Sequence, residues 1–313
     1  MASEHPTRGF VTIATGSDHY YKLAYELMRS YRRNGGNAWP FAILAERENE
    51  YTKAFDKVVL IPDATRSYMD KVRLFDYLPY DETIFIDADC LIYGKVDDWW
   101  DAFGKSGDFS CFGCAYEDLN TELGWFRWDG MGEYKDRIRF IPSFSGGVYY
   151  VRSTPEAGEA FRIAKDAAAR YSEFPFAIFK SPADEPVLAL GMAVCGFRPV
   201  DLQEVGIYVK RRDLPMDILE PRAFWTYRGK TFPVKLVHWG SFGTMKAQYL
   251  LEVERLERDM AGKPMDSLGA KLLYGTGLRY CTLLWHDGLT LLKRVRRRLR
   301  SRRRNRADRK QPL

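Results

Sequence analysis

Short runs of apolar and β-branched residues recur through the first ninety residues of the chain, and turn residues or an amphipathic stretch follow each run. Such runs, bounded by Gly, Asp or Pro, are typical of buried strands, whereas apolar residues spaced three and four apart are typical of helices. Strands are therefore predicted at residues 9–15, 41–45, 57–61 and 83–86, and helices at residues 20–33 and 71–78. This order favours an α/β fold with a mixed, mainly parallel sheet flanked by helices.

The pattern becomes looser after residue 97. Residues 115–140 are rich in aromatic and charged side chains, which indicates a long excursion rather than a regular element. Regular elements resume with a predicted strand at residues 146–151, a helix at residues 155–171, a helix that opens at Asp184, and a strand at residues 234–239. The chain thus carries its regular α/β rhythm mainly in its first third.

Composition excludes several classes of protein. Of the 313 residues, 46% are hydrophobic and 29% are charged, which is the balance of a folded soluble body rather than of a disordered or polytopic membrane chain. Residues 1–6 do not read as a secretory signal. The five cysteines are too few and too scattered for a disulfide framework, and the C-x-x-C of Cys111 and Cys114 lacks a second pair. We expect a cytoplasmic protein.

The net charge of +6 combines two unlike parts. Residues 293–310 hold twelve Lys and Arg against a single acid and carry +11, so the remaining 36 basic and 41 acidic residues leave −5 for the rest of the chain. Apolar residues form an amphipathic stripe with Trp285 over residues 278–299. We therefore expect a main domain over residues 1–265 and a tail over residues 266–313.

The tail has three possible interpretations. A basic amphipathic helix lies in the interface of an anionic membrane, which would attach the protein peripherally to the cytoplasmic face. Arginine-rich segments also bind nucleic acid, but the apolar stripe would then have no purpose and base-stacking aromatics are not interleaved. A solvated, structureless end is the third interpretation and suits residues 301–313. The membrane interpretation is the one that the stripe favours.

Two acids separated by one residue follow the predicted strand at 83–86. Asp87 and Asp89 would share one face of an extended backbone, where their charges repel unless a cation lies between them. Carboxylate oxygens are hard ligands that suit Mn²⁺ or Mg²⁺. The simpler alternative is a polar turn whose acids cap the next element, since short motifs recur by accident.

A second polar group follows a distant strand. His238 closes the predicted strand at 234–239, and Gly240, Gly243 and Lys246 come directly after it. An imidazole could provide a third metal ligand, and a Gly/Lys turn could contact phosphate. Together with the two acids, these residues indicate a metal-bound nucleotide diphosphate, although a lone histidine at a strand end is commonly structural.

With these motifs in order, the sequence resembles the family 8 glycosyltransferases, retaining enzymes with the Rossmann-like GT-A fold that are related to glycogenin and to bacterial lipooligosaccharide galactosyltransferases. The resemblance spans roughly residues 9–250. It implies metal ligands at Asp87, Asp89 and His238, and an acidic pair near the reacting sugar carbon at Asp184 and Glu185. It further implies donor contacts at Ala14, Thr15, Asp18, Tyr20, Lys71, Ala88, Ser145, Gly146, Gly147, Gly240, Gly243 and Lys246.

The resemblance implies a metal-dependent enzyme that moves a hexose from a UDP-sugar to a saccharide or lipid-linked acceptor with retention of configuration. His238 and Lys246 are two residues further apart than in the family pattern, and the aromatic residue after the lysine is missing. Two positions also depart from the pattern, because Ser145 stands where the family usually has Asn and Glu185 where it usually has Gln. These departures keep a second hypothesis open, in which a catalytically degenerate domain serves as a binding or regulatory protein with a membrane- or nucleic-acid-binding tail.

Overall fold

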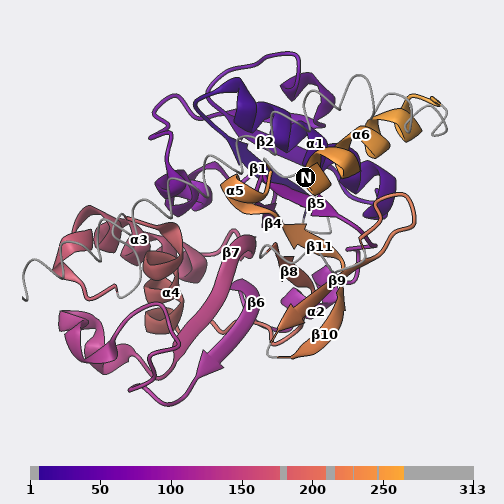
Figure 1. Cartoon of the computed structure of the whole chain (residues 1–313). Helices are drawn as coiled ribbons and strands as arrows, with labels where there is room; N and C mark the ends of the chain where they lie inside the picture. The colour runs from indigo at the N-terminus through magenta and orange to yellow at the C-terminus, as the bar shows by residue number, and fades with distance from the viewer. Residues whose placement is uncertain (1–6, 177–181, 209–215, 228, 245–246, 264–313) are drawn as a thin grey trace, which may run out of the picture. The chain divides into compact units, whose positions relative to one another are not determined.

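A computed structural model describes residues 7–176, 182–208, 216–227, 229–244 and 247–263 (Figure 1). The chain divides into two compact units, Met1–Ser241 and Phe242–Leu313. The first unit holds all the described strands, and the second unit holds the helix α6 (Ala247–Met260). The predicted division at residues 265 and 266 stays a prediction, because the tail lies outside the described residues.

The first unit is built on a six-stranded sheet in the order β3-β2-β1-β4-β7-β6. Its strands are β1 (Arg8–Ala14), β2 (Phe41–Ala45), β3 (Lys57–Leu60), β4 (Glu82–Ile86), β6 (Phe109–Tyr116) and β7 (Ile141–Arg152). Strands β3, β2, β1 and β4 pair in parallel, and β7 runs antiparallel to both β4 and β6. The predicted mixed, mainly parallel sheet is therefore confirmed.

Helices cover both faces of this sheet. Successive residues of a strand point to opposite faces, so neighbouring residues of β1 contact different helices. On one face, the ring of Phe10 lies 4.9 Å from that of Tyr31 in α1 (Asp18–Asn34) and 5.4 Å from that of Trp100 in α2 (Trp99–Gly104). On the other face, the neighbouring Val11 belongs to the buried cluster that includes the apolar stripes of α3 (Pro155–Ala169) and α4 (Asp184–Cys195). Figure 1 shows α4 beside β7.

A three-stranded sheet brings the end of β4 next to a distant part of the chain. It has the order β5-β11-β8, with β5 (Cys90–Ile92), β11 (Leu236–His238) and β8 (Val205–Ile207). Strand β11 is antiparallel to β5, so that His238 lies directly opposite Cys90. The hairpin of β9 (Ala223–Tyr227) and β10 (Lys230–Val234) forms a separate two-stranded sheet. The register between β5 and β11 is what positions His238 beside the acids that follow β4.

Short helical turns complete the architecture. They are η1 (Thr52–Ala54), η2 (Tyr68–Tyr77), η3 (Trp128–Gly130), η4 (Gly132–Arg137), η5 (Tyr171–Glu173) and α5 (Gly240–Gly243). The helix predicted at residues 71–78 is the 3₁₀ helix η2, which starts earlier at a Ser67 cap whose hydroxyl accepts from the Met69 backbone N–H. The strand predicted at residues 146–151 is the second half of the longer β7. The excursion at residues 115–140 contains η3 and η4, whose short turns leave no helical periodicity in the sequence.

The second unit is described only through α6 and the residues beside it. Within α6, Arg258 forms an ion pair of 2.9 Å with Glu254. The two residues are four apart in the sequence, so they lie one turn apart on the same side of the helix. Within the part of the chain that the structure describes, no helix is long and apolar enough to cross a membrane. The amphipathic helix predicted over residues 278–299 lies outside the described residues.

Candidate active site at the end of β4

Acids from β4 and a histidine from β11 meet at one edge of the central sheet. The backbone N–H of Asp87 donates to the Gly147 carbonyl on β7 at 2.9 Å, and the Trp239 N–H donates to the Asp89 carbonyl at 3.0 Å. These two bonds hold the Asp87–Asp89 turn between β7 and β11. The turn therefore has a fixed backbone, and its two carboxylates face His238.

The imidazole of His238 is held from both ring nitrogens. Its Nε2 lies 3.1 Å from Asp89 Oδ1 and 3.7 Å from Asp87 Oδ2, while its Nδ1 lies 3.1 Å from the Ser145 hydroxyl. Burial alone would lower the pKa of His238, but the carboxylates of Asp89 and Asp87 outweigh it and raise this pKa to about 9. At neutral pH and without a metal, His238 is therefore an imidazolium that neutralises one acid charge.

Asp89 and His238 could hold a divalent cation, with Asp87 beside them. Asp89 Oδ1 is buried, and among the described residues His238 Nε2, 3.1 Å away, is its ion-pair partner. Burial raises the pKa of Asp87. At Asp89 burial acts in the same direction, but the charge and hydrogen bond of His238 together with the charge of Lys71 outweigh it and lower the pKa of that carboxyl. Asp89 and His238 offer ligand atoms close enough to share one cation, and Asp87 Oδ2 lies 3.7 Å from the same imidazole. Carboxylate oxygens and an imidazole are ligands that Mn²⁺ or Mg²⁺ accepts.

A cysteine thiol also borders this point. Ligand atoms of Asp89, Cys90 and His238 all lie within 4.8 Å of one another. Cys90 is fully buried, and burial together with the charges of Asp89 and Asp87 raises the pKa of its thiol well above the usual value. Cys90 was not predicted as a site residue from the sequence. Its position directly after the Asp87–Asp89 motif was the available signal, but the facing direction depends on the pairing with β11.

Lys71 connects these acids with a second acidic pair. Its Nζ lies 2.7 Å from Asp87 Oδ2, 3.1 Å from Asp184 Oδ2 and 3.4 Å from the Gly146 carbonyl. Burial alone would lower the pKa of Lys71, but the charges of Asp184, Asp87 and Glu185 outweigh it and raise this pKa well above its usual value. A permanently charged, buried ammonium therefore links the end of β4 to the start of α4.

The acids at the start of α4 pack against a glycine pair in β7. A Cβ added to Gly146 would lie 3.0 Å from both Asp184 Oδ2 and Glu185 Oε1, and one added to Gly147 would lie 2.9 Å from His238 Nδ1. A side chain at either position would therefore push against the functional groups of the site, the carboxylates at Gly146 and the imidazole at Gly147. Burial and the neighbouring Asp184 charge raise the pKa of Glu185, and burial raises that of Asp184.

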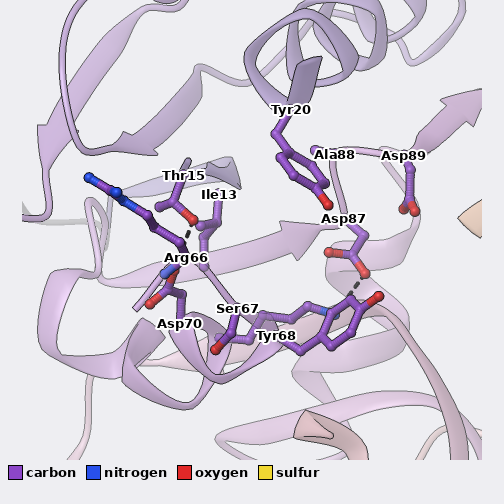
Figure 2. A pocket seen from close by; sticks show the side chains of 11 residues that line it. Ile13, Thr15, Tyr20, Arg66, Ser67, Tyr68, Asp70, Asp87, Ala88 and Asp89 are labelled. Atoms are coloured by element: carbon purple, nitrogen blue, oxygen red, sulfur yellow. Dashed lines mark hydrogen bonds and ion pairs between the residues drawn. The ribbon is translucent and has the colours of Figure 1, made fainter. Parts of the chain in front are cut away.

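A pocket of about 300 Å³ opens beside Lys71 and Asp87 (Figure 2). Figure 2 shows the Tyr20 ring extending from α1 toward Asp87, and Tyr68 coming from the start of η2. Both tyrosines are solvent-accessible, with exposed fractions of 44% for Tyr20 and 58% for Tyr68. The pocket is lined by Ile13, Thr15, Tyr20, Arg66, Ser67, Tyr68, Asp70, Lys71, Asp87, Ala88 and Asp89. Its volume is at the small end of the range for ligand pockets.

Asp70 organises the wall of this pocket opposite the acids. Its carboxylate accepts from the Thr15 hydroxyl at 2.8 Å, from the Thr65 N–H and hydroxyl at 2.6 and 2.8 Å, and from the Arg66 N–H at 3.0 Å. Arg66 has a φ of +58°, a conformation that L-residues adopt only with such support. Asp70 was not predicted from the sequence, because an acid directly before a lysine carries no signal of burial or of these hydrogen bonds.

The remaining residues named from the sequence are distributed unevenly. Ala88 lines the pocket, Ala14 is buried at the end of β1, and the Thr15 hydroxyl is occupied by Asp70. Asp18 does not line the pocket and pairs with Arg47 at 2.6 Å.

The diphosphate contacts predicted after β11 are only partly described. Gly240 follows β11 with a φ of +65°, Gly243 belongs to the second unit, and Lys246 lies outside the described residues. The diphosphate-binding role of these three residues stays a prediction.

The chain is similar to several solved glycosyltransferase structures. It matches the galactosyltransferase LgtC, solved with donor and acceptor sugar analogues, at a TM-score of 0.47 and 13% identity over 83% of this chain and 99% of that one. It matches GlyE from Streptococcus pneumoniae at 0.43 and 12% over 63% and 45%, and the bifunctional enzyme WbbM at 0.39 and 13% over 66% and 41%. No protein-family model and no curated protein matches the sequence. Membership of glycosyltransferase family 8 therefore stays a prediction.

Proposed function

We propose that this protein is a metal-dependent glycosyltransferase that moves a hexose from a UDP-sugar to a saccharide or lipid-linked acceptor with retention of configuration. The observation that carries the proposal is the arrangement around Lys71. Its ammonium forms one ion pair with Asp87, which lies beside Asp89 and His238, and a second ion pair with Asp184 at the start of α4. A donor needs both features, a cation site for its diphosphate and carboxylates for its sugar.

The diphosphate end of the donor would lie at the Asp87–Asp89 turn. Asp87, Asp89 and His238 would hold Mn²⁺ or Mg²⁺, which supplies Lewis-acid stabilisation to the departing diphosphate. The Ser145 hydroxyl, 3.1 Å from Nδ1, would keep the imidazole turned with Nε2 toward the acids. The nucleoside would occupy the adjoining pocket, where the accessible Tyr20 and Tyr68 rings offer flat apolar surfaces.

The sugar end of the donor would lie against Asp184 and Glu185. In the transfer, the bond between the sugar C1 and the diphosphate oxygen breaks with its electron pair on the diphosphate. The acceptor oxygen then bonds to C1, and its proton passes to the diphosphate in a same-face reaction. The two carboxylates would stabilise positive charge at C1 and orient the sugar hydroxyls. Lys71 would keep Asp184 in place through its 3.1 Å ion pair. A covalent intermediate on one of these carboxylates is the other route to retention.

Hydrolysis of UDP-sugars without an acceptor tests this proposal. We expect turnover of one UDP-hexose that requires Mn²⁺ or Mg²⁺ and is lost in Asp89→Asn, while the exposed Asp76→Asn, which removes a surface pair with Lys165, leaves it unchanged. A panel of UDP-sugars that gives neither hydrolysis nor binding would contradict the proposal. Donor binding without turnover would instead support the degenerate binding or regulatory protein.

The acceptor and the cellular place of the reaction rest on the tail. The basic, amphipathic residues 278–299 support peripheral attachment to the cytoplasmic face of an anionic membrane, where a glycolipid acceptor would be reached. The apolar stripe favours a lipid surface over nucleic acid. We therefore propose a membrane-borne saccharide as the acceptor class.

A further inference from the structure

Cys90 has no role in the reaction proposed above, yet its thiol borders the proposed metal site. It opens β5 directly after Asp89 and is completely buried. The antiparallel register places it opposite His238, so both side chains emerge on the same face of the small sheet. The pairing of β5 with β11 therefore places the Cys90 side chain beside His238.

Two ligand sets overlap at this point. The first is the oxygen-rich set of Asp87, Asp89 and His238, in which Asp87 also forms an ion pair of 2.7 Å with Lys71. In the second set, Cys90 takes the place of Asp87, and its three ligand atoms lie within 4.8 Å of one another. Only a modest contraction would bring these atoms to the spacing of a four-coordinate zinc site. Because Asp89 and His238 belong to both sets, one cation excludes the other.

The two sets differ in the metal that they prefer. Oxygen ligands suit Mn²⁺ and Mg²⁺, whereas thiolate sulfur selects softer cations such as Zn²⁺ and Cd²⁺, and imidazole accepts both classes. We propose that Cys90 is a ligand through which this centre binds Zn²⁺ and related thiophilic cations, in competition with the Mn²⁺ of the transfer reaction. This inference rests on the metal site of the proposed function. When the cation binds, the Cys90 S–H bond breaks, the sulfur lone pair forms the metal bond, and the proton is released to solvent.

Co²⁺ is the spectroscopic probe for this ligand. We expect the purified full-length protein to develop a sulfur-to-cobalt charge-transfer band in the near ultraviolet on titration with Co²⁺. Cys90→Ser should abolish the band, and His238→Ala should weaken it. Cys111→Ser is the matched control, because Cys111 is also completely buried in a strand but lies outside the ligand cluster, so its loss should leave the band intact.

Calorimetric titrations test the preference itself. Loss of a group that only supports a metal ligand costs about 10–100-fold in affinity, so loss of the ligand Cys90 should weaken Zn²⁺ binding at least tenfold. The affinity for Mn²⁺ should change far less, because oxygen and imidazole ligands remain. Cys90→Ala serves as a second variant should the serine hydroxyl disturb folding, and circular dichroism melts of both variants report the fold.

The outcomes separate this inference from the proposed function. No charge-transfer band in the wild-type protein, or Zn²⁺ affinity unchanged in both Cys90 variants, would overturn the role of Cys90 even if Mn²⁺-dependent hydrolysis of a UDP-sugar is intact. A band that depends on Cys90, in a protein that neither binds nor hydrolyses UDP-sugars, would establish the thiophilic site and refute the transferase.

Discussion

Metal binding at the end of β4 should release a proton from His238. With a pKa of about 9 in the metal-free protein, this imidazole is charged at neutral pH, and a metal can bind Nε2 only after the proton leaves. At pH 7 this pKa lies about two units above the pH, so about 1% of the molecules carry the neutral ring and the loss of the proton costs about 3 kcal/mol of binding free energy. Between pH 6 and pH 8 the affinity for Mn²⁺ should therefore rise about tenfold per pH unit and level off above pH 9.

Titration calorimetry measures this effect directly. Mn²⁺ binding at pH 7 in two buffers with different ionisation enthalpies should show about one proton released per metal, and almost none above pH 9. His238→Gln keeps a polar side chain of similar reach but cannot titrate. We expect the variant to bind Mn²⁺ more weakly and with little dependence on pH between 6 and 8.

The raised pKa of His238 also makes the stability of the metal-free fold depend on pH. Because the pKa of His238 is raised above its ordinary value of 6.5, protonation stabilises the fold fully below pH 6.5, and this stabilisation is lost as pH rises through about 9. The wild-type melting temperature in chelator should fall over that window by more than that of His238→Gln. The reasoning is refuted if wild-type Mn²⁺ binding at pH 7 releases no proton and its affinity is the same at pH 6 and pH 8.

Three further predictions concern other parts of the site and the tail. Glu185→Gln removes a buried carboxyl beside the proposed position of the reacting sugar, so steady-state kinetics should show kcat changed several-fold with little change in the donor KM. Equal impairment of kcat and of the donor KM would indicate that Glu185 only supports the start of the helix. Asp70→Asn replaces an acceptor of four hydrogen bonds, so it should lower the free energy of unfolding in urea by about 1–3 kcal/mol and weaken UDP binding. An unchanged affinity for UDP would show that Asp70 does not position the pocket. Deleting residues 278–313 should leave donor hydrolysis intact and abolish sedimentation with anionic vesicles, which salt should weaken but not eliminate in the full-length protein. Preferential binding of the full-length protein to RNA would count against the membrane interpretation.

Much of the central sheet could be predicted because its strands declare themselves locally. Nearly every residue of β1, β2 and β4 is buried, and each of these strands carries a run of apolar or β-branched residues that is visible without knowing its neighbours. The three-residue strands β5 and β8 carry no such signal. They exist because β11 pairs with them from far along the chain, and that pairing has no trace in local periodicity.

The candidate site divides along the same physical line. Asp87, Asp89 and His238 could be named in advance because each stands where an apolar strand ends, and strand ends are where open α/β sheets bind ligands. Cys90 and Asp70 could not, because a buried cysteine after an acid and an acid before a lysine are unremarkable until register and hydrogen bonds are known. The double attachment of Lys71 to Asp87 and Asp184 likewise requires the close approach of η2, β4 and α4.

The position of Lys71 explains how so many acids can be buried together. Asp87, Asp184 and Glu185 each have a raised pKa from burial, so without a cation the site would bind protons in place of charge. One ammonium within ion-pair distance of two of them and one imidazolium beside Asp89 oppose this effect of burial. A metal can displace the proton on His238, but it cannot displace Lys71, whose amine is part of the fold. The resident cation therefore secures the acids of α4, while the exchangeable one leaves the end of β4 ready for an anionic ligand.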